Sequence, residues 1–198
     1  MRQKARRCLA VSILLLFLST TSVGQGNRPD TDTTIGCGAV VEGIALCLAP
    51  SAQSGSVTLE LRNTAPKDAI LNLGIMLANG ARQYPSAISL TLTDASGKVH
   101  QGVLAEPVIV AGRLDPFIVP LPHGASLILP LDLTKYALYT SGQIEELRPD
   151  PTKPYTVRAQ FTGKGVSQAE ANLDVKGLAL MPYWMGTALS NTVATTKK

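Results

Sequence analysis

Cysteine and histidine are the side chains most often used for nucleophilic and metal chemistry, and the 198-residue chain has three of the first and two of the second. His100 follows a predicted strand and His123 lies in a predicted turn, places where an exposed polar residue is common. Neither lies beside a nucleophile motif such as G-x-S-x-G. We therefore expect a protein that is not an enzyme, needs no cofactor and has no metal site.

Cys37 and Cys47 are the cysteines that remain if the N-terminal segment containing Cys8 is removed on export. An even pair in an oxidising compartment favours a disulfide bond. The alternatives are a pair of metal ligands or a catalytic thiol, but two cysteines at this spacing, with no histidine nearby, match no zinc-binding pattern. The sequence therefore predicts a disulfide between Cys37 and Cys47.

Aromatic side chains provide the candidate binding residues. Tyr183 and Trp184 are neighbours in a dense apolar stretch near the last predicted strand, and neighbours on a strand face opposite sides. One ring would then point into the core. The other would face outward and, with Tyr136 or Tyr139, could stack on a sugar or anchor a protein partner. The alternative is that both rings pack against a loop.

The N-terminus has the pattern of a cleavable secretory signal. Residues 1–7 contain four basic side chains, an apolar run of eleven residues follows, and the small residues Ser22 and Gly24 precede the expected cleavage site. We expect residues 1–24 to be removed, no membrane segment to be retained, and residues 25–34 to form a flexible lead-in. The protein would then be secreted or periplasmic.

Removal of this leader also changes the charge of the protein. The four charges lost are all basic, so 14 basic and 14 acidic residues remain and the formal net charge falls from +4 to zero. A neutral protein with no basic cluster except its last two residues has no electrostatic reason to bind nucleic acid or an anionic membrane. The expected partner is an unidentified protein or a cell-surface polymer.

Residues 35–198 contain short runs in which apolar and polar residues alternate, separated by Gly, Pro, Asn and Asp, which predicts half-buried strands. In the most regular run, one face consists of Tyr155, Val157, Ala159 and Phe161. We expect this face to point inward, which predicts a central strand. Similar alternation predicts three further strands with these inward residues: Ile44, Leu46 and Leu48; Val57, Leu59 and Leu61; Ile88, Leu90 and Leu92. Apolar runs predict others over 117–119, 127–129 and 186–193.

Helical patterns are short in this sequence. Residues 133–139 and 166–172 could each form a turn or two of helix, and residues 140–154 form a polar stretch that predicts a long loop. We therefore expect an all-β fold: residues 35–198 form a single antiparallel immunoglobulin-like sandwich of about eight or nine strands.

Four segments resemble parts of a known type of domain: Leu121–Ser126, Asp132–Tyr136, Pro154–Ala159 and Ser190–Val193. In this order they are similar to the turn, the "dL..Y" segment, the "Y.v.a" strand and the closing "SN.v" strand of bacterial secreted immunoglobulin-like modules. Similar modules precede some extracellular metallopeptidases. The resemblance implies a sandwich fold and secretion. The chain departs from this pattern in the long insert before Tyr155.

These observations favour a non-catalytic secreted or periplasmic β-sandwich protein that binds a protein or a surface polymer. The resemblance implies one alternative, a regulator of a secreted peptidase that acts as an inhibitor or as a chaperone-like pro-module. The two differ in the partner that the protein should bind.

Overall fold

The computed structural model describes residues 36–105, 112–140, 143–167 and 176–195. The predicted leader, 1–24, and the predicted lead-in, 25–34, lie outside these residues. Thr34–Lys198 forms one compact unit, to which all the described residues belong. Within them, no helix is both long enough and apolar enough to cross a membrane.

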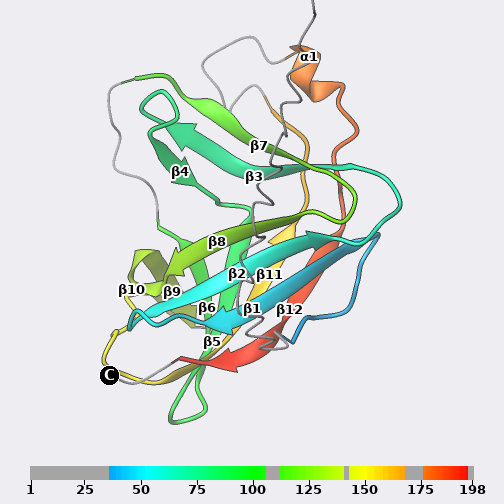
Figure 1. The fold of residues 1–198 in the computed structure, drawn as a ribbon. Helices are drawn as coiled ribbons and strands as arrows, with labels where there is room; N and C mark the ends of the chain where they lie inside the picture. The colour runs from blue at the N-terminus through cyan, green and yellow to red at the C-terminus, as the bar shows by residue number, and fades with distance from the viewer. Residues whose placement is uncertain (1–35, 106–111, 141–142, 168–175, 196–198) are drawn as a thin grey trace, which may run out of the picture. The chain divides into compact units, whose positions relative to one another are not determined.

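The described part of the chain is almost entirely β structure, which confirms the all-β sandwich class (Figure 1). Its strands are β1 (Ile44–Pro50), β2 (Ser56–Asn63), β3 (Ala69–Leu77), β4 (Arg82–Tyr84), β5 (Ile88–Asp94), β6 (Val99–Leu104), β7 (Asp115–Leu121), β8 (Ser126–Asp132), β9 (Tyr136–Thr140), β10 (Gln143–Leu147), β11 (Tyr155–Thr162) and β12 (Thr187–Ala194). Two short helices, η1 (Leu133–Lys135) and α1 (Lys176–Ala179), complete it. These twelve strands exceed the expected eight or nine because β3, β4, β9 and β10 were not predicted.

The strands form three antiparallel sheets, ordered β1-β2-β8, β4-β3-β7 and β10-β9-β6-β5-β11-β12. The chain passes from β2 to β3 and from β7 to β8, so the two three-stranded sheets follow one another along one bent layer (Figure 1). The six-stranded sheet forms the opposite layer. Residues from all three sheets make up one apolar core.

The bend in the first layer is fixed by Asn63, a fully buried amide at the end of β2. Its Nδ2 donates to the carbonyl oxygens of Lys67 and Leu121, each at 2.9 Å, and its Oδ1 accepts a hydrogen bond from the backbone N–H of Ala65 at 3.0 Å. One side chain therefore holds the β2–β3 connection against the end of β7.

The predicted central strand is confirmed as β11, which pairs with β5 on one side and β12 on the other. Tyr155, Val157, Ala159 and Phe161 are all buried, and the intervening side chains are exposed or partly exposed. The ring of Phe161 stacks on Trp184, with centroids 5.2 Å apart and planes 12° apart. This alternation is what a strand with one face on the core requires.

Strand β3 was missed because its sequence, AILNLGIML, is apolar almost throughout and a bulge breaks its period. The bulge lies between Asn72 and Ile75 and contains Gly74, whose φ of 138° suits glycine. Asn72 Oδ1 accepts the backbone N–H of Gly74 at 3.0 Å. A Cβ on Gly74 would lie 2.4 Å from the carbonyl oxygen of Tyr84, so β4 can approach only because this residue is glycine.

The helix expected over 133–139 is present only as η1, and the chain then enters β9. Asp132 caps η1 by accepting the backbone N–H of Thr134 at 3.0 Å. The expectation that 140–154 is entirely loop was wrong, because β10 pairs with β9 within it. The short helix expected over 166–172 falls mostly outside the described residues.

The predicted disulfide between Cys37 and Cys47 is confirmed, with an S–S distance of 2.01 Å. It holds the segment before β1 along the edge of that strand that does not pair with β2. There the backbone N–H of Gly38 donates to the carbonyl of Leu46 at 2.8 Å. A Cβ on Gly38 would lie 1.7 Å from the carbonyl oxygen of Leu189 on β12. Glycine at this position therefore lets the segment pack directly on the backbone of β12.

A side chain, Asn191, joins the edges of the two layers. β12 bulges where Ser190 and Asn191 lie opposite Ala159, and the Ser190 hydroxyl accepts the backbone N–H of Ala159 at 2.8 Å. Asn191 Oδ1 accepts the backbone N–H of Leu48 at 2.7 Å, and its Nδ2 donates to the Leu48 carbonyl at 2.9 Å. The amide thus pairs with β1 as a neighbouring strand would.

Candidate functional site

Tyr183 and Trp184 are both buried, 9% and 7% exposed, so neither ring faces solvent as the strand interpretation required. The residues lie outside the named strands: Tyr183 forms an isolated bridge with Ile70, and the backbone N–H of Trp184 donates to the Ile70 carbonyl at 2.9 Å. Trp184 packs on Phe161, whereas Tyr183 packs in a small separate cluster. Without strand geometry, the alternation of neighbouring side chains does not apply.

The other two candidate aromatic residues lie on β9, and one of them is also buried. Tyr136 is 1% exposed, and Tyr139 is partly exposed opposite Gln101 on β6. The four aromatic residues therefore do not form one exposed binding surface. Only Tyr139 remains accessible, and one ring makes a poor platform for a sugar or a protein.

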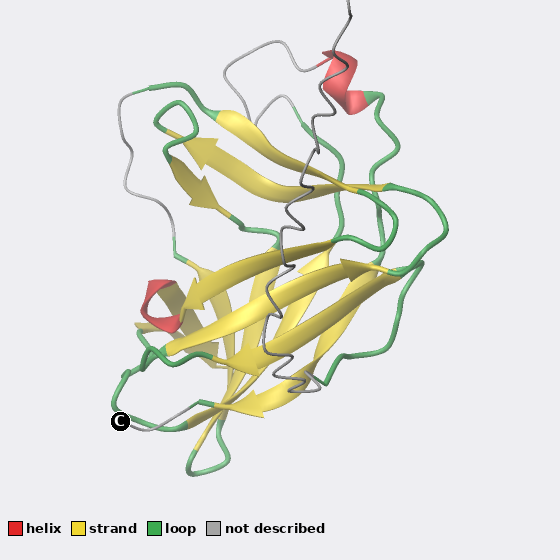
Figure 2. Cartoon of the chain, in the orientation of Figure 1, coloured by secondary structure: helices red, strands yellow, loops and turns green. Residues whose placement is uncertain are grey.

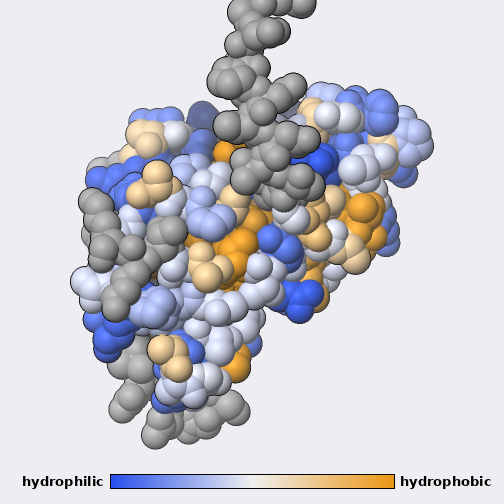
Figure 3. Space-filling model, turned by 60° about the horizontal axis from the view of Figure 1, so that its bottom comes forward, coloured by the Kyte–Doolittle hydropathy of each residue, from blue (hydrophilic) through white to orange (hydrophobic). Residues whose placement is uncertain are grey.

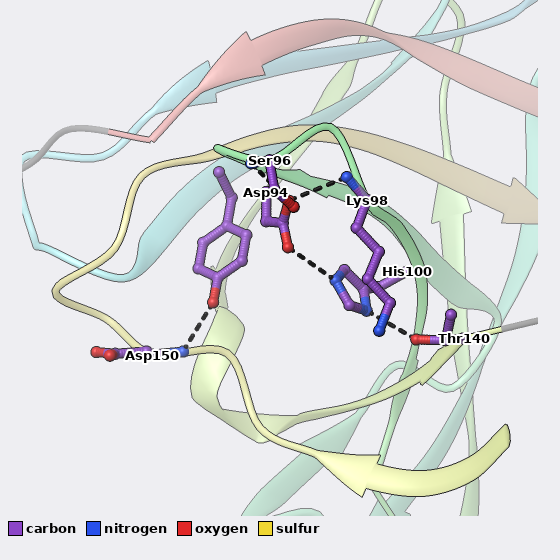
Figure 4. Close-up of polar contacts among 7 residues, drawn as sticks. Asp94, Ser96, Lys98, His100, Thr140 and Asp150 are labelled. Atoms are coloured by element: carbon purple, nitrogen blue, oxygen red, sulfur yellow. Dashed lines mark hydrogen bonds and ion pairs between the residues drawn. The ribbon is translucent and has the colours of Figure 1, made fainter.

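His100 is buried, 6% exposed, so the expectation of an exposed histidine was wrong at this position. Its side chain lies on the inward face of β6, between Asp94 at the end of β5 and Thr140 at the end of β9 (Figure 4). Nε2 is 3.4 Å from Asp94 Oδ2, and Nδ1 is 3.1 Å from Thr140 Oγ1. The ring thus links three neighbouring strands at one end of the sheet.

An acid, an imidazole and a hydroxyl in this order are the components of a nucleophilic triad. However, Asp94 also accepts the Ser96 hydroxyl at 2.6 Å and the backbone N–H groups of Ser96 and Lys98 at 2.9 and 3.0 Å. These bonds, with the Ser96 hydroxyl the largest cause, outweigh partial desolvation and lower the pKa of Asp94 from 3.8 to about 2. Because the carboxylate closes the β5–β6 turn, we assign this group to the stability of the sheet.

His123 lies in the turn between β7 and β8 and is exposed, as its position in the sequence predicted. Its backbone N–H donates to Asp68 Oδ1 at 3.0 Å, and its ring nitrogen Nδ1 contacts the carbonyl oxygen of Ala65. Both contacts reach across to the β2–β3 connection. They give this histidine a structural role in the turn.

A cavity of about 670 Å³ lies where the first layer bends, between β4 and β8, and we call it the β4–β8 cavity. Residues from β3, β4, β6, β8, η1 and β9 line it, and Arg148 after β10 completes the lining. Figure 2 shows η1 as the helix at the end of β8. The volume is that of a typical small-molecule or peptide side-chain site.

Among the described residues, the lining of the β4–β8 cavity carries an excess of positive charge. Three exposed basic residues, Arg82, Lys135 and Arg148, face one carboxylate, Asp132. The Asp132 carboxylate is occupied by Thr134, whose hydroxyl donates to it at 2.6 Å. The side chains of Arg82 and Lys135 have no hydrogen bond or ion pair with any other described residue. Two cations at the cavity are therefore available to a ligand.

Tyr136 lines this cavity, but its hydroxyl oxygen is not accessible from it. Its oxygen is buried and has no hydrogen-bond partner among the described residues. Burial, and next the nearby Tyr84, raise the pKa of Tyr136 well above its usual value, so the hydroxyl keeps its proton. Tyr84 is itself satisfied, because its hydroxyl lies 2.8 Å from the Leu104 carbonyl. Less than 1 Å² of this oxygen is accessible, so a ligand in the cavity cannot come within hydrogen-bond distance of it.

Apart from Gln83, the rest of the described cavity wall is apolar. It consists of Leu77, Pro85, Leu104, Ala105, Pro130 and Leu131, together with the ring of Tyr84. The described lining contains neither cysteine nor histidine, and its carboxylate, Asp132, serves as the cap of η1.

Other surfaces are less suited to bind a partner. The exposed large apolar side chains come from several elements, including β6, β8 and β12, and in Figure 3 hydrophilic residues separate the apolar areas of the face shown. Three edge strands contain proline, which removes backbone donors: Pro50 in β1, Pro116 and Pro120 in β7, and Pro130 in β8. Such edges resist the addition of a further strand.

The basic residues of this site could not be identified from the sequence. Each has the surroundings of an ordinary exposed charge, and the three are spread from residue 82 to residue 148. One signal was present. The "dL..Y" segment, Asp132–Tyr136, which carried part of the resemblance, supplies four lining residues: Asp132, Thr134, Lys135 and Tyr136. A motif that was interpreted as structural thus forms one wall of the cavity.

Among the residues that the structure describes, no group of three or more His, Cys, Asp or Glu side chains could hold a metal ion. No family model, curated protein or solved structure matches the chain. The function is therefore argued from the geometry of the β4–β8 cavity.

Proposed function

We propose that the protein is a non-catalytic, exported binding protein that recognises part of a protein or of a surface polymer in the β4–β8 cavity. The observation that carries this proposal is the pair of exposed side chains of Arg82 and Lys135, which have no partner among the described residues, at a cavity with largely apolar walls.

The alternative ways for a β-sandwich to bind a partner have less support. Addition of a strand is disfavoured at three of the six sheet edges, β1, β7 and β8, because these strands contain proline. An aromatic platform is disfavoured because Tyr136, Tyr183 and Trp184 are buried. The cavity remains the concave, mixed polar and apolar surface that binding sites usually offer.

Export supports the same function. A disulfide between Cys37 and Cys47 is compatible with an oxidising compartment outside the cytoplasm. The sequence pattern of residues 1–24 supports a cleavable signal peptide. We therefore place the protein in the periplasm or outside the cell, where proteins and surface polymers are both available as partners.

The proposal is tested by co-purification from the cell envelope of cells that produce the full chain. Three forms are compared: wild type, the double variant Arg82→Gln/Lys135→Gln, and the control Lys98→Gln, which removes an exposed charge from the β5–β6 turn outside the cavity lining. Envelope components that co-purify are quantified by mass spectrometry and by sugar analysis. Binding in the cavity predicts that one component is lost with the double variant and retained with Lys98→Gln.

The outcomes separate the possible functions. A component that is equally abundant with all three forms, or no component above background, contradicts recognition in the cavity. If the component that depends on Arg82 and Lys135 is a peptidase, the protein is a regulator of that enzyme.

A further inference from the structure

We propose that the ligand group that enters the β4–β8 cavity is an amphiphilic anion, a carboxylate or phosphate joined to an apolar group; this rests on the proposed binding function. The anion pairs with Arg82 and Lys135. The apolar group lies against the wall that contains Leu77, Leu104 and Leu131. The charges of the lining support the first contact, and the chemistry of the wall supports the second.

The charged side chains of the lining select an anion. Arg82 and Lys135 are exposed, and their side chains have no hydrogen bond or ion pair with another described residue. In the described lining the one carboxylate, Asp132, accepts the backbone N–H and the hydroxyl of Thr134 at 3.0 and 2.6 Å. A ligand anion therefore meets unpaired cations, whereas a ligand cation meets a carboxylate that already has partners.

The backbone holds the basic residues at this cavity. Arg82 begins β4, which pairs with β3, and Lys135 ends η1, where its carbonyl accepts the backbone N–H of Ala105 at 2.9 Å. Arg148 Nη1 donates to the carbonyl of Thr134 at 3.4 Å, which places a third basic side chain beside η1. Charge-assisted hydrogen bonds are about twice as strong as neutral ones, so this lining favours an anion over a neutral ligand of similar shape.

The walls of the cavity favour an apolar group beside the anion. They contain three leucines, two prolines and an alanine: Leu77, Leu104, Leu131, Pro85, Pro130 and Ala105. Backbone groups at this wall already have partners within the protein, because the Leu104 carbonyl accepts the hydroxyl of Tyr84 at 2.8 Å and the Ala105 N–H donates to Lys135. The prolines have no N–H to offer.

This wall separates amphiphilic anions from hydrophilic ones. A group rich in hydroxyls loses its hydrogen bonds to water against an apolar wall without regaining them from the protein, which costs free energy. A hydrocarbon group has no such bonds to lose and gains free energy from burial. The cavity volume of about 670 Å³ is sufficient for a small ligand group of this kind.

The test uses probes with hydrocarbon chains of similar length and different headgroups. Octanoate and octyl phosphate are anionic, octyl glucoside is neutral and octylammonium is cationic. Acetate and methyl phosphate supply the two anions without the chain. Each probe is titrated, below the concentration at which it forms micelles, into protein purified after export from cells that produce the full chain. Dissociation constants are measured by isothermal titration calorimetry.

The proposal predicts that octanoate, octyl phosphate or both bind about tenfold or more tightly than every other probe, because only these two combine the anion with the chain. The tighter of the two identifies the headgroup. Added salt should weaken this binding, since salt screens exposed charges. Equal affinity for octyl glucoside would show that charge does not select the ligand, and equal affinity for acetate or methyl phosphate would show that the wall does not; either result overturns the proposal.

Substitutions place the binding in the cavity. Arg82→Gln/Lys135→Gln should weaken the better anionic probe about tenfold or more, since two charge-assisted contacts are lost, and Lys98→Gln should leave it unchanged. Arg82→Lys keeps the charge and should retain the affinity within about threefold. All of these side chains are exposed, so the thermal midpoints should equal that of the wild type. Unchanged affinity in the double variant would overturn the proposal, because the anion would then bind elsewhere.

The inference and the proposed function fail separately. If no amphiphilic anion binds but an envelope component still depends on Arg82 and Lys135, the inference is wrong and recognition in the cavity stands with a ligand of another class. If amphiphilic anions bind through these residues but no component co-purifies, the inference stands, and recognition of a protein or surface polymer is wrong. If neither depends on these residues, both proposals are wrong.

Discussion

Individual residues in this protein reveal their roles through the partners that they have or lack. His100 is buried, but Asp94 and Thr140 flank it, so the sheet accounts for its polarity. Tyr136 is equally buried, but its hydroxyl has no partner among the described residues. The contrast separates a buried polar group that neighbouring strands satisfy from one that the described residues leave unsatisfied.

Asp94 should contribute to the acid sensitivity of the protein. Its pKa is about 2 in the folded state against 3.8 for the free side chain, so below pH 4 the unfolded chain binds the extra proton. The stability that Asp94 contributes is therefore full above about pH 4 and is lost as the pH falls toward 2. Asp94→Asn should make the denaturation midpoint less dependent on pH in this window than in the wild type. The measurement is urea unfolding between pH 2 and 6; identical pH profiles would contradict the assignment.

A strand is predictable from the sequence when one of its faces packs on the core and the other faces solvent. β11 and β5 follow this rule, and their inward residues were identified correctly. β3 was missed because the bulge at Asn72–Ile75 shifts its register, and β9 was missed because Leu133–Tyr139 has the spacing of a helical turn. Both exceptions come from local backbone geometry, which residue periodicity does not record.

The register of β11 can be tested with two adjacent substitutions. Phe161→Ala should cost about 3–5 kcal/mol, because a fully buried ring that stacks on Trp184 is removed from the core. Gln160→Ala, on the partly exposed face, should change stability by about 0.5 kcal/mol or less. Chemical denaturation of the two variants gives the comparison. Equal midpoints would show that the faces are assigned incorrectly.

The link between the edges of β1 and β12 can be tested at Asn191. Asn191→Ala leaves the backbone N–H and C=O of Leu48 without their side-chain partners, so we expect a loss of about 1–3 kcal/mol. Thr192→Ala, at the exposed next position, is the control and should change stability by about 0.5 kcal/mol or less. If both variants unfold at the wild-type denaturant concentration, the side chain does not hold the layers together.

For the whole molecule, the sequence indicated the sandwich class and the disulfide, because both depend on short-range patterns. The binding cavity could not be predicted in the same way. Its lining comes from segments between Leu77 and Arg148 that meet only because the first layer bends between β2 and β3 and between β7 and β8. The aromatic residues Tyr183 and Trp184 looked like a site in sequence but belong to the interior.

Export of the whole chain predicts a defined N-terminus. Residues 1–24 have the basic start, apolar run and small residues that signal peptidases recognise, so the exported protein should begin at Gln25 or within a few residues of it. Mass spectrometry of the protein from the periplasm or the culture medium gives this directly. Protein in either fraction that still carries Met1 would contradict cleavage.

Site-specific photo-cross-linking tests the central claim, recognition in the β4–β8 cavity, most directly. A benzophenone amino acid replaces Gln83, which lines the cavity from β4, or Lys98, which lies in the β5–β6 turn, in the full chain produced in its own cells. Irradiation should yield a discrete adduct from position 83 that is absent from position 98 and that Arg82→Gln/Lys135→Gln abolishes. Equal adducts from both positions, or an adduct at position 83 that survives the double substitution, would contradict the account.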